Sequence, residues 1–111
     1  MNDTHRIIAA SDSGISIRSS GDISDALGAS LGAKGLILTE SDLAPEFFDL
    51  RSGLAGELFQ KFINYKVRVA IVLPDAEAYG ERFGELAYEH RSHSLIRFVR
   101  SEDEAKAWLD T

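Results

Sequence analysis

The sequence predicts one small α/β domain, built on a mostly parallel sheet of four to five strands with helices packed on it. Short apolar runs alternate along the chain with segments of helical periodicity, and this alternation is typical of β-α-β units. The chain has 111 residues, the size of one ordinary domain. With 44% hydrophobic and 27% charged residues, its composition is that of a globular protein. We therefore expect residues 1–111 to form a single domain.

The first elements are expected to be a β-hairpin. The apolar run 7–10 is followed by the turn-like sequence 11–14 and then by the alternating pair Ile15 and Ile17. Two short apolar segments around a turn rich in Ser, Asp and Gly favour antiparallel pairing. The predicted element order is therefore ββαβαβαβα.

The remaining elements follow from apolar periodicity and from stop signals. Helical segments carry apolar residues three and four positions apart, whereas continuous runs rich in β-branched residues predict buried strands. A capping box at residues 101–104 predicts the start of the last helix. The expected elements are a helix at 22–31, a strand at 35–39, a helix at 54–65, a strand at 67–73, a helix at 83–89, a strand at 95–99 and a C-terminal helix from Ser101.

Charge and composition exclude several classes of function. The formal net charge of −6 repels phosphate backbones, and Arg91, Arg97 and Arg100 form only a thin basic grouping, so we expect no nucleic-acid binding. No apolar stretch approaches the ~20 residues that cross a bilayer. The chain has no cysteine and we find no secretion signal, which favours a cytoplasmic location.

A histidine pair is the one pattern that could suggest a metal. His90 and His93 lie three residues apart beside Glu89, a spacing that can present ligands from a helix. The pair falls in a polar segment where a helix is expected to end, and cations are favourable at such an end. We therefore prefer a solvated helix end and expect no metal and no cofactor.

A resemblance to a known family spans nearly the whole chain. It is carried by the run 36–39, the segment 45–58, the segment 60–62 and Tyr65, which together resemble the bacterial family catalogued as domain of unknown function 4180. The resemblance implies a small cytoplasmic bacterial protein. It brings no activity and no catalytic residue.

The segment Asp49–Leu54 has a more distant resemblance, to STAS domains, the fold of anti-sigma-factor antagonists. Their Asp-Ser-Ser/Thr-Gly-Leu motif opens the second helix and carries a phosphorylatable hydroxyl, and the element order ββαβαβαβα is theirs. The resemblance implies that Ser52 is a phosphorylation candidate. A hydroxyl at such a position also caps helices, and this alternative stays open.

The carboxyl edge of the sheet is where we expect a partner to bind, because parallel sheets bind ligands beyond the ends of their strands. We expect a non-enzymatic, STAS-like regulatory or protein-interaction module that binds an unknown protein partner or a second copy of itself at this edge. An enzyme is disfavoured because the sequence contains no recognisable set of nucleophile, base and orienting group. The alternatives are a homodimer that binds a small molecule and a small hydrolase or lyase that uses Asp42, Asp49 and Arg51. The residues of the expected partner edge are Asp42, Glu46, Phe47, Asp49, Arg51, Ser52 and Asp75.

Overall fold

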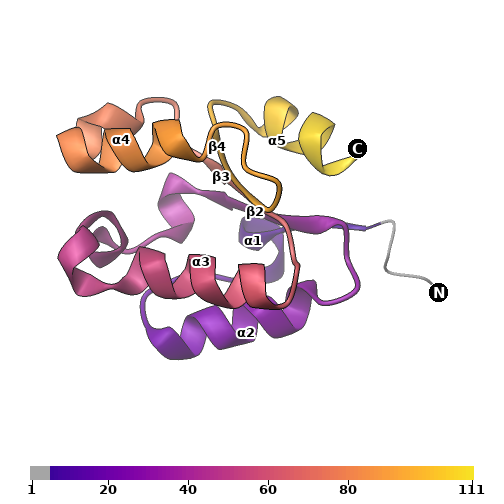
Figure 1. Ribbon diagram of the computed structural model, residues 1–111. Helices are drawn as coiled ribbons and strands as arrows, with labels where there is room; N and C mark the ends of the chain where they lie inside the picture. Colours follow the sequence, from indigo (N-terminus) through magenta and orange to yellow (C-terminus); the bar gives the residue numbers. More distant parts are fainter. Residues whose placement is uncertain (1–5) are drawn as a thin grey trace.

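The computed structural model describes residues 6–111 and contains a four-stranded sheet in which all strands are parallel (Figure 1). The strands follow one another across the sheet in the order of the sequence, β1-β2-β3-β4. The predicted α/β class with a mostly parallel sheet is confirmed. The strand bounds are β1 (Ile7–Ala9), β2 (Gly35–Thr39), β3 (Val69–Val72) and β4 (Ile96–Val99).

Helices α2 (Ser20–Ser30), α3 (Leu54–Asn64) and α4 (Glu81–Glu89) cover one face of the sheet, and the C-terminal helix α5 (Glu102–Leu109) packs on the other. Right-handed connections give this arrangement when strands are added in sequence. In Figure 1, α2 and α3 lie together at the bottom, and α4 and α5 lie at the top. A short helix, α1 (Ala10–Ser13), follows β1.

The predicted N-terminal hairpin is wrong. After β1 the chain forms the single helical turn α1, which ends at Gly14 with a φ of 70°, so the turn-like residues end a helix and do not reverse a strand. Ile17 then forms an isolated parallel bridge with Leu43. Its N–H donates to the carbonyl of Asp42 at 2.7 Å. The partner of Ile17 is therefore distant in the sequence, which local alternation could not indicate.

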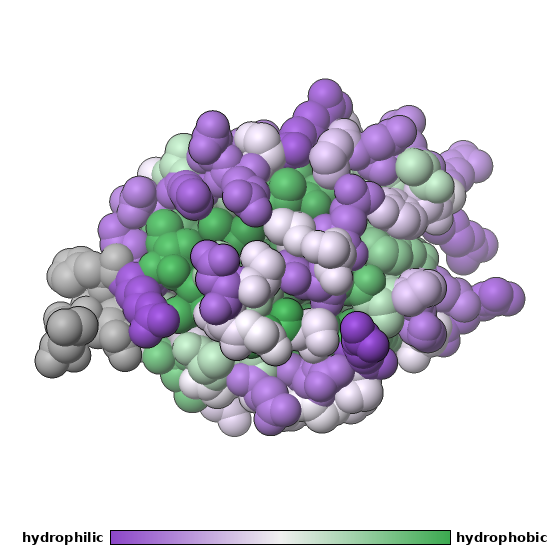
Figure 2. All heavy atoms as spheres, turned by 180° about the vertical axis from the view of Figure 1, so that it is seen from behind, coloured by the Kyte–Doolittle hydropathy of each residue, from purple (hydrophilic) through white to green (hydrophobic). Residues whose placement is uncertain are grey.

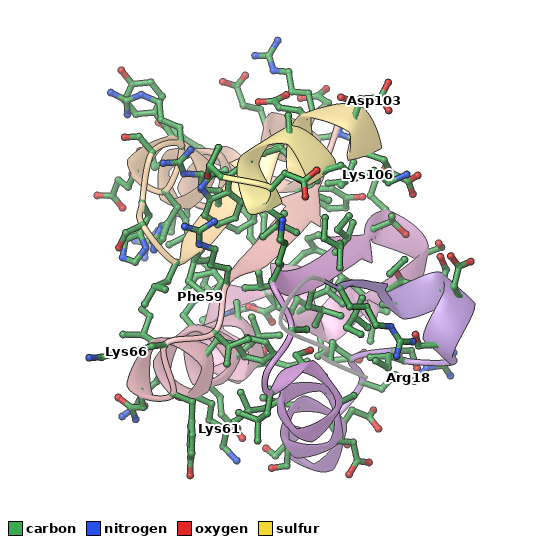
Figure 3. All side chains as sticks on the ribbon, turned by 90° about the vertical axis from the view of Figure 1, so that its right-hand side faces the viewer. Arg18, Phe59, Lys61, Lys66, Asp103 and Lys106 are labelled. Atoms are coloured by element: carbon green, nitrogen blue, oxygen red, sulfur yellow. The ribbon has the colours of Figure 1, made fainter. Side chains whose placement is uncertain are left out.

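The larger core lies under α2, α3 and α4. Helix α3 contributes an apolar stripe in which Leu58 and Phe62 are both completely buried, as the apolar periodicity of this segment predicts. On its outer side Lys61 projects towards α2 and donates to the hydroxyl of Ser24 at 2.8 Å (Figure 3). Helices α2 and α3 are thus joined by apolar packing on their buried sides and by a hydrogen bond on their exposed sides.

The smaller core lies between the sheet and α5. A Cβ atom added to Gly35 would lie 2.4 Å from Cδ2 of Leu109, so the glycine allows α5 to approach β2 closely. Trp108 is stacked with the guanidinium groups of Arg68 and Arg97, at 5.5 and 4.7 Å from its ring centre. One helix therefore suffices to close this face.

Polar side chains cover most of the side shown in Figure 2, which is opposite to that of Figure 1. Its broadest apolar area lies at the left of the view, and smaller apolar areas lie between polar groups further to the right. Across residues 6–111, every helix is too short or too polar to span a bilayer.

Candidate functional site

Three consecutive 3-10 turns connect β2 to α3 at the carboxyl edge of the sheet. They are η2 (Glu40–Asp42), η3 (Pro45–Phe48) and η4 (Leu50–Ser52), and we call residues 40–52 the ledge. The ledge lies at the left of Figure 1, where the chain passes from β2 to α3. Six of the seven residues of the expected partner edge lie on it. The inner side of the ledge faces the protein core and its outer side faces solvent, and the six residues are distributed over both sides.

Asp42 lies on the inner side and has a structural role. Its carboxylate accepts hydrogen bonds from the backbone N–H of Thr39 at 2.8 Å and from the Thr39 hydroxyl at 3.0 Å. The side chain is buried. The carboxylate of Asp42 is thus bound within the protein, and its part in a partner surface stays a prediction.

Phe47 also lies on the inner side and is completely buried, so its ring is not exposed at the partner edge. Its ring makes edge-on contacts with Phe48 and Phe83, with centroid distances of 5.7 and 6.2 Å. Phe48 in turn stacks on Tyr79 at 3.8 Å. These aromatic rings form one cluster behind the ledge.

Tyr79 belongs to η5 (Ala76–Tyr79), the turn that follows β3, and links this turn to the ledge. Its hydroxyl donates to the carboxylate of Glu40. This hydrogen bond, together with partial burial, raises the pKa of Tyr79 to about 12. Sequence reasoning placed Phe47 at the partner edge but missed Tyr79, because only the fold brings η5 against the ledge.

Asp49 and Arg51 lie on the outer side and pair with each other. Oδ1 of Asp49 accepts from the backbone N–H of Arg51 at 3.1 Å and from its Nε at 3.3 Å. These hydrogen bonds lower the pKa of Asp49 below its ordinary value of 3.8. Both side chains are exposed. The pair is therefore available to a partner, together with the exposed Glu46.

Ser52 is exposed, but its hydroxyl has two local partners. Oγ donates to the carbonyl of Glu46 at 2.6 Å and accepts from the backbone N–H of Leu54 at 3.2 Å. The second bond occupies the first free N–H group of α3, although the N-cap residue of this helix is Gly53, which has no side chain to cap it. Gly53 follows with a φ of 78°, which lets the chain turn into α3. Phosphorylation of Ser52 stays a prediction.

An open groove of about 500 Å³ lies between the ledge and α4. Leu50, on the ledge, is 37% exposed and lines this groove with the half-buried Leu86. Glu81, Glu85 and Glu89 also line it and are exposed. Sequence reasoning missed Leu50, because a single apolar residue in an irregular segment carries no periodic signal.

Asp75 is exposed but does not lie on the ledge. It lines a separate hollow of about 440 Å³ near the ends of β3 and β4, together with Arg91, Arg100 and Glu104. The expected partner edge is therefore divided between two places.

The histidine pair occupies the connection between α4 and β4. The rings of His90 and His93 lie 5.2 Å apart. Nδ1 of His93 accepts hydrogen bonds from backbone N–H groups, and that of His90 lies 3.0 Å from the carbonyl of Leu86. Within residues 6–111, no three side chains of His, Asp or Glu come together in a group that could hold a metal ion.

The strand order also bears on ligand binding. In parallel α/β sheets, ligands commonly bind where the strand order reverses and adjacent connections leave towards opposite faces. The order β1-β2-β3-β4 contains no reversal, and the aromatic cluster behind the ledge reaches the sheet at Phe98 of β4 through Phe83. The protein is thus a parallel α/β domain with an exposed ledge that follows β2 and an aromatic cluster behind this ledge.

The particular family is shown by comparison. The chain belongs to the family described as Domain of unknown function (DUF4180), whose family model matches residues 2–109. Comparisons with the curated proteins and with the solved structures found no match. The relationship to STAS domains stays a hypothesis.

Proposed function

We propose that this protein is a non-enzymatic interaction module that binds a protein partner at the outer side of the ledge and the adjoining groove. The observation that carries the proposal is the exposed Leu50 in a groove with an acidic wall. The proposed setting is a regulatory role in the bacterial cytoplasm, which a chain without cysteine suits.

The groove supports a partner with an apolar anchor. Leu50 and Leu86 provide the apolar surface of its lining. Small clusters of buried contacts supply most of the binding energy in protein interfaces, and the polar rim excludes water around them. An apolar side chain that covers Leu50 therefore supplies affinity, while the polar residues of the ledge fix its position.

The charge of α4 supports basic groups beside that anchor. Glu81, Glu85 and Glu89 follow one another at four-residue spacing, so they share one face of the helix. None of them belongs to an ion pair between residues 6 and 111. Arg82 also lines the groove and is the one cation on its wall. The fitting partner is a segment with an apolar residue flanked by Lys or Arg, because such charges complement this wall.

The hydrolase or lyase alternative gains no support from the geometry. Asp42 is occupied by Thr39, and Asp49 is occupied by Arg51. No hydrogen bond joins Asp42 to either member of the Asp49–Arg51 pair within residues 6–111. A catalytic pair of carboxylates needs a common space for the reacting group.

Peptide display tests the proposal with a matched control. A library of helical peptides, which vary in their apolar anchor residue and in the charge of the flanking residues, is selected for binding to three proteins. These are the unmodified protein, Leu50→Asp and Leu31→Asp. Leu31 is also exposed and lies at the end of α2, so it tests the same substitution away from the groove. We expect the unmodified protein to select basic peptides with one apolar anchor. Leu31→Asp should still bind these peptides, and Leu50→Asp should not. Enrichment of acidic peptides, or equal retention by both variants, contradicts the proposal.

The hollow beside Asp75 favours a small-molecule site as a second candidate, because it lies near the carboxyl ends of β3 and β4. Arg100 and Glu104 would provide charged groups to a ligand there. A thermal-shift screen of metabolites, repeated with Arg100→Gln and paired with a measurement of molar mass, tests this alternative and the proposed homodimer. A ligand whose stabilising effect is lost in Arg100→Gln supports it. The absence of any shift removes it.

A further inference from the structure

His93 occupies an unusual place at the start of the edge strand β4. Its Nδ1 atom accepts two backbone hydrogen bonds, from Leu95 at 3.0 Å and from Ile96 at 3.1 Å. A ring nitrogen accepts only while it carries no proton. Both hydrogen bonds therefore require the form of His93 in which Nδ1 is unprotonated.

The two hydrogen bonds of His93 hold its loop against the first residues of β4. The strand order places β4 at one edge of the sheet, where backbone groups have no neighbouring strand on one side. Ile96 is nevertheless completely buried. The loop that carries His93 is fixed from the other direction by Arg97, whose Nε donates to the carbonyl of His93 at 2.7 Å. Side chain and backbone of one residue thus hold the loop to the strand.

From these contacts we infer that His93 is a proton-sensitive lock on β4: a proton on Nδ1 breaks both backbone hydrogen bonds and releases the loop of residues 90–95 from the strand. The inference is independent of partner binding at the ledge, because it rests on a different part of the molecule.

The surroundings of His93 oppose its positive charge. His90 lies at the end of α4 and faces it, and Arg97 approaches from β4. Both act as like charges when His93 is protonated, and the ring is partly buried. Between residues 6 and 111, no carboxylate forms an ion pair with His93. Phe59 of α3 contacts the ring of His90 and contributes no charge.

The direction of the pH dependence follows. Burial first, and then the charges of His90 and Arg97, lower the pKa of His93 below its ordinary value of 6.5. The unfolded chain therefore binds this proton more readily than the folded protein. The stabilising contribution is complete above the unfolded pKa and is lost as the pH falls towards the folded pKa. The lock is closed at neutral pH and opens in acid.

Amide hydrogen exchange measured by NMR tests the lock. Protection factors of Leu95 and Ile96 are compared between about pH 8 and about pH 5, the range in which histidine titrates. The amide of Ile71, in the interior strand β3, reports global opening. In the unmodified protein we expect the two amides to lose protection about tenfold relative to Ile71, which is the order of magnitude expected when a backbone hydrogen bond is lost.

The variant His93→Asn is the matched control. Its Oδ1 atom can accept the same hydrogen bonds but does not titrate, so protection should be independent of pH. In His90→Asn the loss should persist and move to a higher pH, because one like charge is gone. Unchanged protection in the unmodified protein at about pH 5 overturns the inference, as does an equal loss in His93→Asn.

A measurement on the unmodified protein keeps the inference testable if the variants do not fold. Ring nitrogen chemical shifts of His93 report which atom carries the proton. The lock requires an unprotonated Nδ1 at neutral pH and protonation in step with the loss of protection at Leu95 and Ile96. A proton on Nδ1 at neutral pH overturns it.

Discussion

The inner and outer sides of the ledge are built from the same short stretch of chain, yet they serve different purposes. On the inner side, Asp42 and Phe47 are buried and hold the segment against the protein. On the outer side, Asp49, Arg51 and the partly exposed Leu50 face solvent. Position next to a candidate motif therefore says little about availability to a partner. Burial and hydrogen bonding decide which residues can bind one.

The largest effect on stability is expected at Phe47. Replacement with alanine removes a fully buried ring and its contacts with Phe48 and Phe83. We expect Phe47→Ala to lower the free energy of unfolding by about 3 to 5 kcal/mol, measured by urea denaturation. A loss below about 1 kcal/mol would place this ring outside the core.

Asp42 is expected to have the next largest effect. In Asp42→Ala the backbone N–H of Thr39 loses its acceptor, which costs about 1 to 3 kcal/mol when the group stays buried. Asp42→Asn retains a side-chain oxygen and should cost less. Urea denaturation of both variants measures the difference. Equal stability of Asp42→Ala and the unmodified protein would show that the capping bonds contribute nothing.

Substitutions of Ser52 are expected to have a smaller effect on stability than those of Asp42, and they separate a structural role of this residue from a role in binding. Ser52→Ala removes the acceptor for the N–H of Leu54 and should cost about 0.5 to 2 kcal/mol. Ser52→Asp keeps an acceptor and should be less destabilising, although it cannot donate to the carbonyl of Glu46. If Ser52 is a phosphorylation switch, Ser52→Asp must also change the affinity for a ledge-binding peptide. Unchanged affinity leaves Ser52 as a structural residue only.

The smallest effect on stability is expected at Leu50. Leu50→Asp places a charge on an exposed position and should change the free energy of unfolding by about 0.5 kcal/mol or less. Thermal and urea denaturation check this expectation. A destabilisation as large as that of Phe47→Ala would show that Leu50 belongs to the core and that the two sides of the ledge do not differ.

The regular elements could be predicted where a single local pattern determined them. Strand β2 matches its predicted range because a continuous apolar run is buried on both faces, and α3 matches within one residue because of its apolar stripe. The N-terminal hairpin was wrong because Ile17 pairs with Leu43, a contact that depends on the whole fold.

The candidate site was only partly predictable for the same reason. The segment 49–52 was identified from its motif, and its polar residues are exposed as a binding surface requires. The burial of Phe47 depends on Phe83 of α4, and the groove at Leu50 depends on the position of α4 beside the ledge. Short 3-10 turns have too few residues to show periodicity, so neither feature has a signature in the sequence.

The most direct test of the ledge as a binding surface is an NMR titration of the isotope-labelled protein with the peptide selected by display. We expect chemical-shift changes at Leu50, Arg51 and the groove face of α4, with α5 unaffected. The same titration of Leu50→Asp should show no saturable change, while Leu31→Asp behaves as the unmodified protein. Changes centred on α5, or unaltered binding to Leu50→Asp, would show that the outer side of the ledge does not bind the peptide.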